Sequence, residues 1–237
     1  MLAGLAASAD AGLDGGAASL PFPAVSSYFY LPPDHYDARI VAAGVADCAT
    51  GIGPDATGLP LFARDTFATI ALVGDVQAGD GGLRLVGFMD DGQAKTLGVR
   101  FINAAPELDS ADFGTGSLAT TFKALFTNVG FGKAGAAPAS PPDGSAPIDS
   151  NGYASIKPLS LATLSAHSHG ATEDAVIATD VTAASGGVVT FILIAPDPNA
   201  PTAADAGSAP TARFLECVDN AATIGLLGSC TVLVPAL

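Results

Sequence analysis

Gly187-Val-Val-Thr-Phe-Ile-Leu-Ile194 is the stretch that decides the fold of this chain. Its short, nearly continuous apolar run is typical of a central strand of a β-sandwich. An earlier stretch, Thr66-Phe-Ala-Thr-Ile-Ala-Leu-Val73, has the same character. Two further matches keep the same order. Residues 28–33 and 36–41 match 153–158 and 161–164, before these stretches, and residues 83–91 match 212–220, after them. Ordered self-similarity of this kind indicates two copies of one structural unit.

The two copies predict two tandem domains, residues 1–94 and 95–237. The polar segment Asp90-Asp-Gly-Gln-Ala-Lys-Thr96 marks the boundary between them. The second copy opens with an apolar strand pattern at 98–106, whereas only an Ala- and Gly-rich stretch precedes Phe22 in the first. We therefore expect the first copy to lack its opening strand, through N-terminal truncation or through divergence to a shorter design. A missing strand exposes a sheet edge, which favours self-association or poor solubility.

The composition predicts an all-β fold of antiparallel sheets. Hydrophobic residues make up 49% of the 237 residues and charged residues only 14%, with 28 glycines and 17 prolines. High apolar content argues against disorder, and frequent Gly and Pro argue against long helices. Short strands joined by many turns satisfy both conditions. Alternation and β-branched residues place the expected strands at 25–31, 36–42, 67–73, 83–89, 99–103, 122–129, 152–156, 161–166, 176–179, 188–195, 212–218 and 230–234.

The charge balance limits the partners. Lysine and arginine number 9 against 23 acidic residues, for a formal net charge of −14. Nucleic acid is excluded as a partner, because its binding depends on cationic side chains, and anionic membrane surfaces are disfavoured for the same reason. No window is long and apolar enough for a transmembrane segment. The first residues also lack the basic and apolar regions of a secretory signal.

The three cysteines nevertheless indicate an oxidising compartment. Cys217 and Cys230 lie in neighbouring expected strands joined by one loop, and this spacing predicts a disulfide of the kind that exported β-domains carry. Two independent buried thiols are the alternative. Cys48 is left unpaired, and we expect its partner in the strand that the first copy lacks.

A family resemblance begins at Val99-Arg-Phe-Ile-Asn-Ala-Ala-Pro-Glu-Leu108. This stretch, followed by Asp112-Phe-Gly, by Phe126-Thr-Asn-Val-Gly-Phe-Gly-Lys133 and by Gly152-Tyr, resembles a bacterial family of exported domains known as domain of unknown function 4397. The resemblance spans the second copy and the first from about Phe22. It implies tandem immunoglobulin-like or transthyretin-like β-sandwiches attached to or released from the cell envelope. It implies no catalytic residue.

Two histidines are the strongest candidates for chemistry. His167 and His169 lie two residues apart near the end of an expected strand, so their rings project from one face. The spacing permits a shared metal, with Glu173 or Asp174 as third ligand. A solvated strand end before the Gly170 turn is the alternative, and it is the one we expect. We therefore predict no metal site.

Catalytic motifs are absent from the sequence. It contains no Gly-x-Ser-x-Gly elbow, no His-Glu-x-x-His pair, no phosphate loop and no dinucleotide fingerprint. Ser165, His167 and Asp180 form no triad that spacing alone supports, because triads are recognised by geometry. His35, in a Pro-Asp-His-Tyr turn, carries no signal of its own. We expect no catalytic residue and no enzymatic activity.

Acidic loops and a run of aromatic residues leave binding roles open. Acidic and amide oxygens gather in expected loops, at Asp75, Asp80, Asp90, Asp91, Asp143, Asp149, Asn151, Asp197, Asn199 and Asp205. Calcium accepts such oxygens, but none of these groups matches a calcium-loop motif, and ordinary turn chemistry is the preferred explanation. The run Tyr28-Phe-Tyr30 favours packing on one sheet face, with glycan or protein binding as the alternative.

Together these observations predict an exported protein of the cell envelope or the extracellular space, with a structural or adhesive role. We take its signal peptide to be lost with the N-terminus. A calcium- or glycan-binding module that acts through the acidic loops is the first alternative, and an envelope hydrolase is the second. The sequence identifies no ligand and requires no cofactor.

Overall fold

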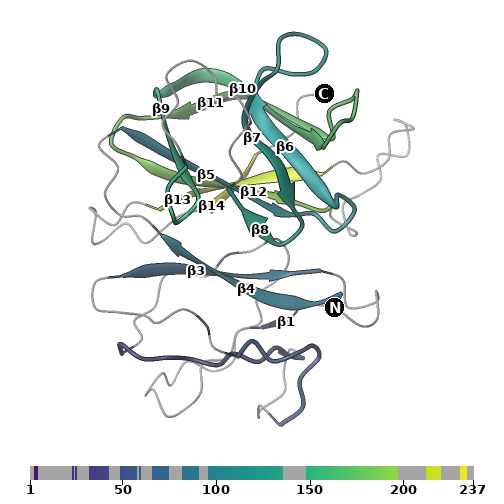
Figure 1. Ribbon diagram of the computed structural model, residues 1–237, viewed down its shortest axis with the longest axis vertical. Helices are drawn as coiled ribbons and strands as arrows, with labels where there is room; N and C mark the ends of the chain where they lie inside the picture. Colours follow the sequence, from purple (N-terminus) through teal and green to yellow (C-terminus); the bar gives the residue numbers. More distant parts are fainter. Residues whose placement is uncertain are drawn as a thin grey trace. The chain divides into compact units, whose positions relative to one another are not determined.

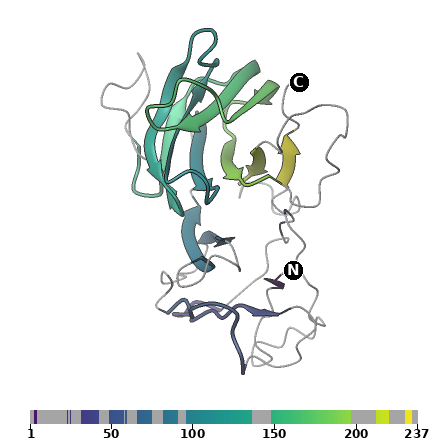
Figure 2. The ribbon, with the colours of Figure 1, turned by 90° about the vertical axis from the view of Figure 1, so that its right-hand side faces the viewer.

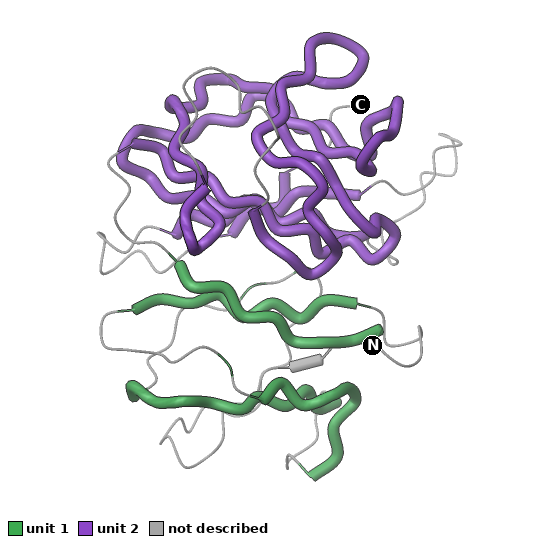
Figure 3. Tube along the Cα trace, in the orientation of Figure 1, with its two compact units in different colours: residues 1–90 green, residues 91–237 purple. Residues whose placement is uncertain are grey.

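The computed structural model describes residues 3–4, 23, 25, 32–42, 49–57, 59, 66–74, 82–90, 96–135, 148–196, 212–219 and 230–233. All regular elements within these ranges are β-strands, which confirms the all-β prediction. This part of the chain contains no helix with the length and hydropathy needed to cross a membrane. The chain divides into two compact units, residues 1–90 and residues 91–237 (Figure 3). The predicted linker, Asp90 to Thr96, contains this division.

The described residues of the second unit form two sheets (Figures 1 and 2). One is antiparallel, in the order β11 (Val176–Ala183), β10 (Leu159–Ser168), β6 (Ser110–Thr115) and β7 (Lys123–Gly130). The other sheet has six strands, in the order β14 (Cys230–Leu233), β13 (Arg213–Val218), β12 (Val188–Ile194), β5 (Leu97–Ala104) and β8 (Lys133–Ala134). Its sixth strand, β9 (Tyr153–Ile156), also pairs with β5. This second sheet is mixed, because β5 and β12 run parallel, so the prediction of purely antiparallel sheets is wrong for it.

Strand β12 is buried along its whole length. Val189, Phe191 and Leu193 face the core that the two sheets share, while the alternate residues, Val188 and Thr190 among them, are buried on the opposite face. A strand buried on both faces is stabilised by apolar residues at every position, because each side chain is removed from water. The continuous apolar run in the sequence follows from this double burial.

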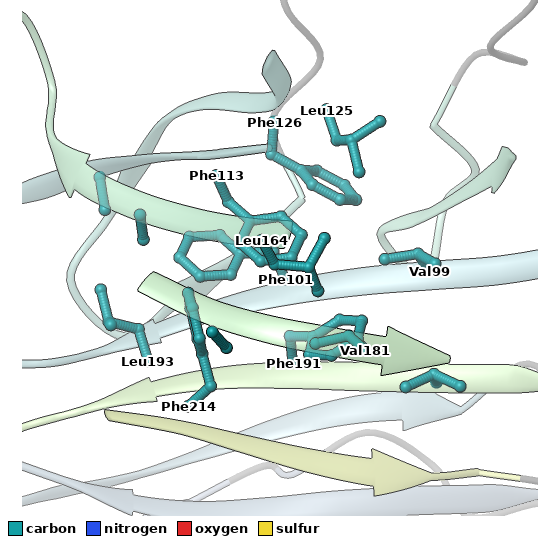
Figure 4. Packing of buried hydrophobic residues seen from close by; sticks show 14 of the residues in the cluster. Val99, Phe101, Phe113, Leu125, Phe126, Leu164, Val181, Phe191, Leu193 and Phe214 are labelled. Atoms are coloured by element: carbon teal, nitrogen blue, oxygen red, sulfur yellow. The ribbon is translucent and has the colours of Figure 1, made fainter. Parts of the chain in front are cut away.

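Phenylalanine rings join the two sheets (Figure 4). The ring of Phe101 on β5 stacks on that of Phe113 on β6, with centroids 4.7 Å apart and planes 7° from parallel. Phe126, Phe191 and Phe214 pack around the Phe113 ring at centroid distances of 6.1, 5.4 and 5.5 Å. Each such ring pair adds about 0.5–1.5 kcal/mol beyond simple area burial. Phe113 is therefore the centre of the core between the two sheets.

The loop after β6 depends on glycine. Gly116 has a φ of +83°, and a Cβ atom there would lie 2.1 Å from the carbonyl oxygen of Thr121. Only glycine adopts this conformation at such a close approach without strain. The loop thus folds back tightly, and its Leu118 and Phe122 contact the polar cluster described below.

The described residues of the first unit form two antiparallel sheets of two strands each. β3 (Phe67–Val73) pairs with β4 (Arg84–Asp90), and β1 (Ala3–Gly4) pairs with β2 (Val41–Ala42). A small core forms from the buried side chains of Ile40, Leu83 and Leu85, with partly buried Ala38, Ile52, Ala56 and Ile70 around them. Arg39 and Asp55 form an ion pair at the surface.

Several strand predictions are corrected. The expected strand 36–42 is strand only at Val41–Ala42, because Ala38 instead bonds Ala56 of the irregular segment 49–57 at 2.9 Å. Strand β6 was not expected, since Ser-Ala-Asp-Phe-Gly-Thr has low β-propensity and its position depends on pairing with β7 and β10. The expected strand 25–31 lies almost entirely outside the described residues.

Candidate functional site

A cluster of two histidines and two aspartates lies on the four-stranded sheet. His167 on β10 is the register partner of Asp112 on β6. Leu164 and Ala166 point into the shared core, so His167 lies on the opposite face of the sheet. His169 follows two residues later and reaches the same carboxylate. The predicted projection of both histidines from one face therefore holds.

Asp112 is the centre of the cluster. Its Oδ1 lies 2.9 Å and its Oδ2 3.1 Å from Nδ1 of His169, and its Oδ2 lies 3.6 Å from Nε2 of His167. The backbone N–H of Asn128 donates to Oδ1 of Asp112 at 2.7 Å. Asn128 has a φ of +53°, a conformation that asparagine tolerates better than most residues. Two histidines and one backbone amide thus surround a single carboxylate.

Asp174 lies on the other side of His167. Its Oδ2 accepts a 2.8 Å hydrogen bond from the backbone N–H of Leu118, and its Oδ1 lies 3.4 Å from Nδ1 of His167. Neither that oxygen nor that nitrogen has a hydrogen-bond partner, and the same is true of the Ser165 hydroxyl. An unpaired buried polar atom costs about 1–3 kcal/mol. The cluster therefore contains polar atoms whose bonding capacity is unused.

Burial divides the cluster into a closed part and an open part, so the expected solvated strand end is wrong for His167 and correct for His169. The side chain of His167 is 4% exposed and that of Asp174 is 6% exposed, and the ring of Phe122 contacts His167 edge-on at 4.5 Å. The side chain of His169, by contrast, is 50% exposed. Solvent therefore reaches the cluster through His169.

The structure settles which predicted residues meet. It brings Asp174 to His167, whereas Glu173 is exposed. It adds Asp112, which the sequence does not identify as a neighbour because the pairing of β6 with β10 is not readable from spacing. Across the described part of the chain, no three His, Cys, Asp or Glu side chains converge as the ligands of a bound metal do. Ser165 is fully buried and Asp180 is exposed on β11, so they do not meet as triad members.

A second polar cluster is buried on the six-stranded sheet. Arg100 on β5 donates from Nε to the hydroxyl of Thr190 at 3.0 Å, and its guanidinium lies 4.6 Å above the ring of Tyr153. Asp219 accepts hydrogen bonds from the hydroxyls of Tyr153, at 2.9 Å, and Thr190, and lies 3.8 Å from the guanidinium. All four residues are at most 5% exposed. Such a network links β5, β9 and β12 and neutralises a buried charge.

The structure contains the disulfide between Cys217 and Cys230. These cysteines are register partners on β13 and β14, so the bridge ties the edge strand of the six-stranded sheet to its neighbour. Cys48, expected to be unpaired, lies outside the described residues.

Two of the acidic residues in the expected loops, Asp149 and Asp90, accept hydrogen bonds within the protein. Oδ1 of Asp149 accepts from the backbone N–H groups of Asn151, at 2.8 Å, and Tyr153, at 2.9 Å, which is ordinary turn chemistry. Asp90 accepts from the hydroxyl of Thr69. The other acidic loop residues, namely Asp75, Asp80, Asp91, Asp143, Asp197, Asn199 and Asp205, lie outside the described residues, as do Tyr28, Phe29 and Tyr30.

Among the residues that the structure describes, two carboxyl groups have shifted pKa values. Burial raises the pKa of Glu216 on β13 above its ordinary value of 4.5. The hydrogen bond from Arg39 lowers the pKa of Asp55 below its ordinary value of 3.8. Neither group belongs to the two polar clusters, so these shifts do not bear on the candidate site.

The two polar clusters differ in access to solvent. The Arg100 cluster is closed, and a closed ionic network holds strands together but meets no substrate. The histidine cluster opens to solvent at His169 and is the stronger functional candidate. The chain matches no protein-family model, no curated protein and no solved structure.

Proposed function

We propose that this chain is a non-enzymatic β-sandwich protein of the bacterial cell envelope or extracellular space, with a structural or adhesive role. The observation that carries the proposal is the Cys217–Cys230 disulfide at the edge of the six-stranded sheet. Disulfides persist in oxidising compartments and are rare in the cytosol. The acidic composition, with a net charge of −14, adds solubility outside the cell.

The finer architecture belongs to the same proposal. We take both units to be immunoglobulin-like or transthyretin-like sandwiches in tandem. The stretches that match between the copies support this: β3 and β4 form an antiparallel pair in the first unit, and their counterparts β12 and β13 form an antiparallel pair in the second. Self-association of the first unit through a sheet edge remains a prediction, to be tested by light scattering.

Burial of the candidate nucleophile supports a non-enzymatic role. Ser165 has no exposed surface, and a hydrolase needs its nucleophile within reach of substrate. Broad esterase and glycosidase screens of the purified chain should therefore return no turnover. Any reproducible turnover would contradict the non-enzymatic proposal, and Ser165→Ala would then show whether Ser165 or another nucleophile is responsible.

Localisation is tested in the source cells. An antibody against this chain should detect it in the envelope or secreted fraction, and protease added to intact cells should digest it. Thiol alkylation before lysis should leave Cys217 and Cys230 unmodified, because they are bonded to each other. A chain found in the cytosol with both thiols alkylated would refute the proposal.

The adhesive role needs its own measurement. Beads coated with the purified chain should bind to cells or to extracellular glycans, and soluble chain should compete for the same sites. Beads coated with the chain reduced and alkylated at its cysteines provide the matched control. Coated beads that bind no more than uncoated ones would leave the structural role as the function of this protein.

A further inference from the structure

We propose that His167 is a buried imidazolium ion that joins Asp112 to Asp174, and that its proton makes the stability of the second unit depend on pH. Each ring nitrogen of His167 faces a carboxylate. Nε2 lies 3.6 Å from Oδ2 of Asp112, and Nδ1 lies 3.4 Å from Oδ1 of Asp174. Both are ion-pair distances, so no side chain has to change its place. The proposal is independent of the structural or adhesive role, because it concerns what holds the fold together.

A neutral imidazole cannot satisfy two carboxylates at once. It has one N–H group and one nitrogen lone pair, so one of its nitrogens would present a lone pair to a carboxylate oxygen. The doubly protonated ring donates from both nitrogens. Nδ1 of His167 and Oδ1 of Asp174 are buried and have no other partner, so a neutral ring with its proton on Nε2 would leave both unpaired. Protonation of His167 gives each of these atoms its partner.

The burial of Asp174 is a second, independent observation. Its side chain is 6% exposed, and a buried carboxylate is stable only beside a cation or enough hydrogen-bond donors. Its Oδ2 accepts the backbone N–H of Leu118, which is a neutral donor. Within the described part of the chain, His167 is the one group in ion-pair contact with Asp174 that can carry a positive charge. Asp174 therefore favours the protonated ring.

The neighbouring elements add one more titratable group to the cluster. Nδ1 of the half-exposed His169, at the end of β10, lies 2.9 Å from Oδ1 of Asp112. The backbone N–H of Asn128 on β7 donates to the same oxygen, and the loop after β6 contributes the ring of Phe122. Neither β7 nor β11 places a charged side chain in ion-pair contact with the cluster. Among the described residues, its two aspartates thus have only its two histidines as cations.

The proton on His167 couples folding to pH. In an unfolded chain, histidine loses its proton around pH 6.5. A folded chain that keeps the proton between two carboxylates therefore binds one proton more than the unfolded chain above that pH. This contribution to stability is fully present below about pH 6.5 and is lost as pH rises, by about tenfold in the folding equilibrium constant per pH unit. The second unit should accordingly be more stable in mildly acidic than in mildly alkaline surroundings.

Urea unfolding of the purified chain between about pH 6 and about pH 8 tests this coupling. We expect the folding equilibrium constant of the parent chain to fall by about tenfold or more over this range. His167→Gln keeps an amide donor but does not titrate, so it should remove most of that fall. His169→Gln and His35→Gln remove the other two histidines of the chain and are the matched controls, and each should retain most of the fall.

Nitrogen NMR of the parent chain decides the question even where His167→Gln fails to fold. At about pH 7.5, both ring nitrogens of His167 should give the resonance of a protonated nitrogen, whereas an ordinary histidine is neutral at this pH. In Asp174→Asn, His167 should lose its second ring proton at a lower pH than in the parent. A lone-pair resonance from His167 of the parent at about pH 7.5, or an equal fall in stability in His167→Gln and the parent, would overturn the proposal.

Discussion

Reduction of the Cys217–Cys230 disulfide should destabilise the second unit by about 3 kcal/mol. The bridge joins residues separated by 13 positions in the chain. In the chain-entropy account, a closed loop of this size removes about 10 cal/mol/K from the unfolded ensemble, which is about 3 kcal/mol at 25 °C. Domains of this size have a total free energy of unfolding of about 5–15 kcal/mol, so the loss is a large fraction of it.

Urea unfolding, followed by far-ultraviolet circular dichroism, measures this difference. The oxidised chain should unfold at a higher midpoint than the chain in reductant, and intact mass under denaturing conditions should rise by about 2 Da on reduction. The double variant Cys217→Ala/Cys230→Ala should match the reduced chain and no longer respond to reductant. The control is Cys48→Ser, which should retain the full response. A change below about 0.5 kcal/mol, or an unchanged mass, would refute the reasoning.

Further perturbations test the core, the turns and the charges. Phe113→Ala should cost about 3–5 kcal/mol in the free energy of unfolding, because the ring is fully buried among four others, whereas Phe113→Leu should cost clearly less; urea midpoints compare them. Gly116→Ala should lower the unfolding midpoint, because its φ is +83° and a Cβ meets the Thr121 carbonyl; an unchanged midpoint would mean that the loop relaxes freely. Since burial raises the pKa of Glu216, the folded state binds its proton more tightly than the unfolded state, and stability falls as pH rises from the ordinary value of 4.5 to the raised one; Glu216→Gln should remove that decline in pH-dependent unfolding. Calcium at millimolar concentrations should leave the thermal midpoint unchanged, and a calcium-dependent rise would favour the acidic-loop module instead.

Local patterns predicted the β-character of the chain well. The runs at 67–73 and 188–195 are strands within one residue, because β-branched and aromatic residues bounded by Gly and Pro leave few alternatives. Strand β6 was missed for the opposite reason. Its Asp112 and Gly114 have low β-propensity, and only pairing with two neighbours makes the segment a strand.

The histidine cluster shows the same division. The spacing of His167 and His169, two residues apart, predicted that both lie on one face, since side chains alternate along a strand. Asp112 comes from a strand more than fifty residues earlier, and register with His167 depends on how β6 lies beside β10. Asp174 reaches His167 from the turn after β10, and the loop after β6 holds its carboxylate through the backbone N–H of Leu118.

By itself, the sequence determined the all-β class, the central place of the 188–194 strand in its sheet and the candidate pairing of Cys217 with Cys230. These depend on residues close together in the chain, where alternation, turn residues and loop length act directly. Only the tertiary structure decided that β5 and β12 lie parallel, that Phe113 is the centre of the core and that one aspartate serves both histidines. Such contacts join distant segments, and their register depends on the packing of both sheets together.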